Sequence, residues 1–124
     1  MLPLFLIALF GALGCLGRYL LAGWVNRLSG PGFPYGTLSV NLIGAFIIGL
    51  IMEFSLRSSA IPASLRVGIT IGFLGGFTTF STFSYETFRL LEDGELLVAM
   101  INVTVSVMIC LTCTWLGIMA ARQI

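Results

Sequence analysis

Four long apolar stretches divide the chain, and short polar segments rich in glycine, proline or charge separate them. The stretches cover residues 3–24, 35–54, 66–90 and 96–121. Each is long enough to cross a bilayer, because hydrocarbon of about 30 Å needs about 20 mostly apolar helical residues. The connecting segments are too short to be domains. The pattern predicts an all-α membrane protein, with residues 1–124 forming a single four-helix transmembrane domain.

Composition supports the membrane interpretation and excludes other classes. Apolar residues make up 58% of the chain and charged residues only 9%, whereas soluble domains carry about 25% charged residues. The six basic residues are all arginine, and the net charge is +1. The chain therefore lacks the basic surface that a nucleic-acid partner requires, and its surroundings are the lipid bilayer.

The arginines near the ends of the spans do not favour one orientation strongly. With four spans, Arg57, Arg66 and Arg122 share one side of the membrane, and Arg27 and Arg89 lie on the other. Orientation usually follows an excess of such residues on the cytoplasmic side. A near tie, and a bundle too small for a central pathway, predict an antiparallel, dual-topology homodimer. A single-topology protein with a weak bias is the alternative.

The first residues do not resemble a secretory signal. No lysine or arginine occurs in residues 1–17, and a signal peptide begins with positive charge. A short four-span chain without a targeting sequence is typical of the bacterial inner membrane. We therefore expect a multi-pass protein of that membrane.

Glycine is abundant, and one glycine pair predicts an interrupted helix. There are 15 glycines in 124 residues, and in lipid most such residues let helices approach closely. Gly75 and Gly76 lie in the middle of the third span and are followed by Thr78 and Thr79. We predict that the third helix is broken there. Such a break is tolerated where protein or water covers it, and its freed carbonyls can hold a cation.

Polar residues inside the other spans leave several roles open. Asn41 shares a helical face with Thr37, and its amide either joins two helices or lines a path. Arg18 either extends to the interface, pairs with a carboxylate, or binds the carbonyls at a helix C-terminus. In the fourth span, Cys110 and Cys113 are better read as small packing residues than as zinc ligands, because there is no histidine.

The most specific motif is GFLGGFTTFSTFSYE at residues 72–86. Phe73, Phe77 and Phe80 are expected to share a helical face, with Phe83 three residues further on. Hydroxyl side chains alternate with the rings. Phenylalanine in a membrane helix usually packs, but this alternation at a helix break also suits a path for a small anion, because ring edges are positive.

The chain resembles the fluoride channel family, called Fluc or CrcB, over essentially its whole length. The resemblance rests on the four spans, on the segments 14–18, GTLSVNLIG at 36–44 and GFLGGFTTFSTFS at 72–84, and on the short tail after Trp115. It implies a dual-topology homodimer with two fluoride pores and a central structural sodium ion. It also implies that backbone carbonyls of Gly75 and Thr78 from both subunits hold the sodium.

By motif position, Asn41, Phe80 and Phe83 are expected to line the pores. The neighbouring hydroxyl residues expected to contribute are Thr37, Ser81, Thr82 and Ser106. The resemblance also implies a row of hydroxyl side chains along the fourth span. Ser106 belongs to this row, Cys110 occupies a later position in it, and Thr114 is the hydroxyl residue that could replace Cys110 there. Arg18 is expected to be a structural charge.

The resulting functional hypothesis is passive fluoride efflux by a protein that is not an enzyme. The sequence shows no phosphate-binding loop and, without histidine, no common catalytic triad. The alternatives are a fluoride–proton exchanger that uses Glu86, a small dual-topology drug exporter, and a membrane assembly factor without transport. An exporter needs a carboxylate at the centre of a span, and none occurs there.

Overall fold

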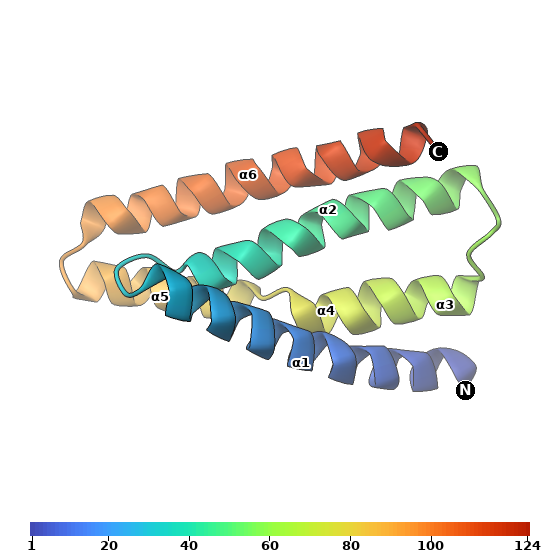
Figure 1. Cartoon of the computed structure of the whole chain (residues 1–124), viewed down its shortest axis with the longest axis horizontal. Coiled ribbons are helices and arrows are strands. Elements are labelled where there is room, and N and C mark those ends of the chain that lie inside the picture. Colours follow the sequence, from blue (N-terminus) through green and yellow to red (C-terminus); the bar gives the residue numbers. More distant parts are fainter.

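The computed structural model describes all residues 1–124, which form four membrane-length helical segments (Figure 1). The first two are α1 (Leu2–Ser29) and α2 (Tyr35–Arg57). The third combines α3 (Ala63–Val67), the π-helix η1 (Gly68–Phe73), α4 (Leu74–Phe77) and α5 (Phe80–Glu92). The last is α6 (Leu96–Arg122). The predicted all-helical fold with four spans is confirmed, and each helix extends a few residues beyond the predicted bounds.

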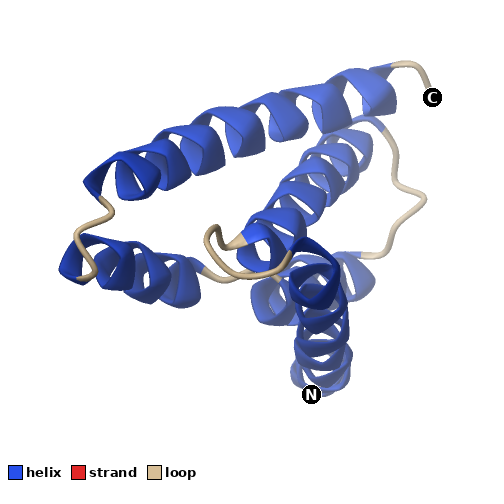
Figure 2. Cartoon of the chain, turned by 60° about the vertical axis from the view of Figure 1, so that its left-hand side comes forward, coloured by secondary structure: helices blue, strands red, loops and turns tan.

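The helices run alternately up and down, so both termini lie at the same end of the molecule (Figure 1). Helix α2 occupies the middle, with α6 packed along one side. Helix α1 packs mainly on η1 and α4, and Figure 2 shows it on the other side of α2 from α6. Only 15 of 124 residues are buried. Most apolar side chains therefore point outward, as expected of helices surrounded by lipid.

Close helix contacts depend on glycine, as predicted from the glycine content. A side chain at Gly14 of α1 would collide with the backbone of Phe73. A side chain at Gly72 would approach the Ile7 carbonyl oxygen to 2.8 Å. Gly49 and Gly117 play the same role between α2 and α6, where each lies against the other helix's backbone. Dispersion between closely packed backbones therefore holds both helix pairs together.

The third span is broken within the predicted stretch, at its two threonines rather than at its two glycines. Gly75 and Gly76 are helical, and the chain becomes extended at Thr78 (ψ 160°) and Thr79 (φ −152°). Threonine is β-branched and favours extended backbone, whereas Gly76 is held in α4 by close packing on Gly11 and Cys15 of α1. Thr79 then caps α5, because its hydroxyl accepts a 3.2 Å hydrogen bond from the Thr82 N–H. The π-helix at η1 was not predicted.

The glycine contacts predict a difference between two substitutions in the same helix. Gly14→Ala should lower the thermal unfolding midpoint in detergent by several degrees, because overpacking costs about 1–3 kcal/mol. Gly23→Ala is the matched control, since nothing lies within 4 Å of the added methyl group. Circular dichroism of both variants measures the midpoints. Equal midpoints would contradict the close contact between α1 and η1.

Candidate functional site

An open groove of about 610 Å³ runs along the broken third span, between α2 and α6. Its lining includes six residues predicted to carry function from three separate parts of the chain: Asn41, Gly75, Thr78, Phe80, Phe83 and Ser106. Cys110 and Thr114 extend the lining along α6. The structure therefore brings together most of the predicted site on one face of a single chain.

Asn41 bridges α2 to the break by two hydrogen bonds. Its Nδ2 donates to the Thr79 carbonyl oxygen at 2.9 Å, and its Oδ1 accepts from the Thr79 N–H at 2.7 Å. These bonds satisfy backbone groups that a continuous helix would have paired. An amide carries two N–H donors, so one remains uncommitted beside the groove. Asn41 thus joins α2 to the break, which is one of the two roles left open by the sequence. Its role in lining a path stays a prediction.

The two phenyl rings of the groove belong to α5 and contact each other. The ring centroids of Phe80 and Phe83 are 5.5 Å apart, and the planes are tilted by 48°. Phe80 is 79% exposed, which is unusual for a ring unless lipid or another chain covers it. Both rings line the groove, and the edge of a phenyl ring carries partial positive charge.

The expectation that Phe73, Phe77 and Phe80 share one face is wrong. Phe73 and Phe77 stack at 5.5 Å, and Phe77 is buried against Gly17 of α1. The extended residues at the break rotate the start of α5, so that Phe80 turns away from this pair and meets Phe83. Before the break, Phe73 and Phe77 therefore pack against each other, and after the break, Phe80 and Phe83 line the groove.

Hydroxyl groups line the groove, but their protons are already used within the chain. Thr70 donates to the Arg66 carbonyl at 2.9 Å, and Thr78 donates to the Leu74 carbonyl at 2.8 Å. Thr114 donates to the Cys110 carbonyl at 3.1 Å, and Ser106 donates to Asn102 Oδ1 at 3.3 Å. Thr79 donates to Thr82 Oγ1 at 3.0 Å. Among the side chains of the lining, the uncommitted polar hydrogens are thus the second Asn41 N–H and the Cys110 S–H. The sequence favours a packing role for Cys110.

Three predicted hydroxyl residues lie outside the groove. Thr37 is buried and donates a short hydrogen bond to the Glu86 carboxylate. Glu86 lines a separate pocket of about 720 Å³ near the 30–34 loop. Ser81 is exposed, and Thr82 contacts Thr79. Their contribution to a path stays a prediction.

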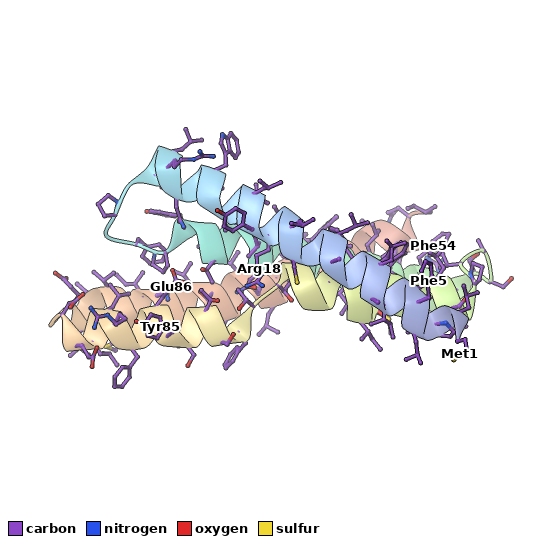
Figure 3. All side chains as sticks on the ribbon, turned by 90° about the horizontal axis from the view of Figure 1, so that it is seen from below. Met1, Phe5, Arg18, Phe54, Tyr85 and Glu86 are labelled. Atoms are coloured by element: carbon purple, nitrogen blue, oxygen red, sulfur yellow. The ribbon has the colours of Figure 1, made fainter.

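Arg18 binds the end of α4, which is the third of the arrangements that the sequence allowed. Its Nε donates to the Gly76 carbonyl oxygen at 3.0 Å. The last carbonyls of a helix lack intrahelical partners, and positive charge is favourable beside them. Figure 3 shows Arg18 where α1 crosses the break between α4 and α5, with Glu86 further along α5. Arg18 does not line the groove.

The carbonyl groups at the break suit a hard cation. Neither the Gly75 nor the Thr78 carbonyl oxygen accepts a hydrogen bond, because the Thr79 N–H bonds Asn41 Oδ1 and the Thr82 N–H bonds the Thr79 hydroxyl. Both residues line the groove. Gly75 has open space around its Cα, with nothing within 4 Å of an added Cβ. Hard cations prefer such neutral or anionic oxygens, but need more than two of them. One chain therefore offers two free carbonyl oxygens at the break, fewer than such an ion needs.

Comparisons with known proteins agree with this geometry. The family model described as CrcB-like protein, Camphor Resistance (CrcB), matches residues 5–118. A Geobacter metallireducens protein named fluoride-specific ion channel FluC is 72% identical over 124 residues, which is 100% of both chains. Proteins of the same name from Citrifermentans bemidjiense and Geobacter sulfurreducens are 73% and 67% identical, each over 95% of both chains. The chain therefore belongs to the CrcB family.

Proposed function

We propose that this protein is a fluoride-specific ion channel that lets fluoride leave the cytoplasm passively. The observation that carries the proposal is the groove at the broken third span, where two phenyl rings and an uncommitted amide hydrogen line a space without any carboxylate. The relatives that share its full length are named fluoride-specific ion channels. A membrane that is negative inside supplies the driving force, about 2.3 kcal/mol per charge for 100 mV.

The groove can replace the water around a small anion with several weak donors. The edges of Phe80 and Phe83 carry partial positive charge, and Asn41 offers an N–H that no other group uses. Because the neighbouring hydroxyl protons are directed to internal acceptors, the lining keeps a fixed arrangement when the anion passes. Selectivity arises because a filter must compensate for a lost hydration shell, which several preorganised contacts do better than one.

We propose that the groove is one half of a pathway and that a second, antiparallel copy covers it. The exposed ring of Phe80 and the open face of the groove support this arrangement, as does the nearly even division of the arginines between the two sides. In the dimer, the unpaired carbonyls of Gly75 and Thr78 from both copies would hold a structural sodium ion. The assembly would have two pores and lie in a bacterial inner membrane.

A fluoride–proton exchanger is the main rival, with Glu86 as the proton carrier. Glu86 binds Thr37 and lies outside the groove, so the groove itself contains no group that takes up protons. A drug exporter would need a carboxylate beside its substrate, and the groove has none.

Purified protein in liposomes should release fluoride rapidly when a potassium ionophore balances the charge. Chloride release should stay at the level of protein-free liposomes. Flux should persist with equal pH on both sides, because a channel needs no proton gradient. A fluoride electrode records the efflux. Flux that requires a pH gradient would support the exchanger, and absence of any fluoride flux would support an assembly factor.

Replacing either ring of the groove should remove the flux. Phe80→Ile and Phe83→Ile keep an apolar side chain but lose the positive ring edge. We expect fluoride efflux at the background of empty liposomes, with unchanged elution in size-exclusion chromatography. Phe88→Ile is the matched control, because Phe88 is an exposed ring of the same helix outside the groove. Normal flux through both groove variants would remove the rings from the pathway.

Asn41→Asp should block the pathway while preserving the shape of the side chain. The substitution removes both amide N–H groups, including the one that donates to the Thr79 carbonyl, and adds a negative charge. At 4 Å and an effective dielectric constant of 20 the repulsion is about 4 kcal/mol, which corresponds to about a 1000-fold loss of flux. Stopped efflux with normal protein yield is the expected result. Unchanged flux at pH 7 would show that fluoride does not pass Asn41.

A further inference from the structure

We propose that Cys110 and Cys113 form a two-coordinate site for a soft, thiol-binding metal ion, of which Hg²⁺ is the representative, and that its occupation closes the groove. The closing effect rests on the proposed channel function. The binding itself does not, because it depends only on where the two thiols lie.

The two cysteines stand one helical turn apart on α6. Residues separated by three positions are neighbours on a helix surface, about 5–6 Å apart at Cβ. Both side chains are half-buried and neither forms a disulfide. Cys110 lines the groove between Ser106 and Thr114. A metal ion bound by the pair would therefore lie at the edge of the groove, within the same turn of helix.

The Cys110 thiol is free to lose its proton to a metal. Its side chain makes no hydrogen bond, whereas the neighbouring hydroxyls of Ser106 and Thr114 donate within the chain. Deprotonation of Cys110 therefore breaks no existing interaction. Thiolates are the ligands that soft metals prefer, and the other polar groups of this stretch are hard oxygen ligands.

The apolar surroundings favour a metal complex that has no net charge and needs only two ligands. Two thiols and Hg²⁺ give a neutral, two-coordinate mercury dithiolate and release two protons, so no net charge is buried. The groove wall here is apolar, with Ile48, Val107 and Leu111. Zinc takes four ligands, and no group of three or more metal-binding side chains exists in the chain. The pair thus suits a metal that is satisfied by two sulfurs.

Cys15 provides an internal comparison. It lies on α1 against Gly76, on the side of α4 that packs on α1, and it does not line the groove. It can react with mercury singly, but it has no second thiol one turn away. Removing it leaves the proposed pair as the only thiols in the protein.

The experiment titrates Cys15→Ser protein in detergent with HgCl₂ and then measures fluoride efflux from liposomes. We expect one Hg²⁺ per chain, loss of both reactive thiols, and release of two protons. Cys113→Ser in this background should weaken binding about 100-fold or more, because the second contact is no longer intramolecular. Zn²⁺ should not compete. In liposomes, Hg²⁺ should stop efflux, and excess dithiothreitol should restore it.

The possible outcomes test the metal site and the channel function separately. Inhibition that persists in Cys110→Ser, compared with that variant's own untreated flux, would overturn the closing of the groove. Equal affinity in Cys113→Ser would overturn two-coordinate binding. If the untreated protein carried no fluoride, the proposed function would fail, while the stoichiometry and proton release would still decide whether the metal site exists.

Discussion

The structure depends on how the chain satisfies its backbone where the third span breaks inside the membrane. Without water, each unpaired N–H or C=O costs several kcal/mol, so the interruption at Thr78 and Thr79 requires partners from elsewhere. Asn41 pairs both backbone groups of Thr79, and Arg18 pairs the Gly76 carbonyl. The carbonyls of Gly75 and Thr78 stay free. Two polar side chains thus hold the break open, and the groove exists because α5 starts again in a new direction.

The sequence was sufficient to predict the spans, because hydrocarbon thickness fixes the length of an apolar helix. It also located most of the groove, since Asn41, Phe80 and Ser106 stand out as polar or aromatic residues in apolar surroundings. It predicted the break within the stretch from Gly75 to Thr79, but not that the threonines rather than the glycines would leave the helix. Glycine lowers helix propensity locally, but Gly76 is held helical by packing on α1, and that contact between distant segments cannot be read from local composition.

The same limitation explains the error in the phenylalanine faces. A helical period extrapolated from Phe73 through Phe77 to Phe80 assumes a continuous helix, and two extended residues change the direction of everything that follows. The sequence also could not show which side chains of the groove already donate hydrogen bonds within the chain. Whether Ser106 or Thr114 offers its proton to the groove depends on acceptors one turn earlier in α6. Cys110 is less polar than either residue, yet its side chain has no such acceptor and keeps its proton uncommitted.

The position of Arg18 adds an electrostatic consequence to its structural role. Its guanidinium binds the α4 terminus from the α1 side, while Gly75 of the same turn faces the groove. A charge one helix diameter away, about 10 Å, interacts with an anion by about 1–2 kcal/mol at an effective dielectric constant of 20. That attraction would favour an anion in the groove without placing a charged side chain in its path, where strong binding would hold the anion. Arg18, which stabilises the interrupted helix, therefore also adds positive potential beside the break without lining the groove.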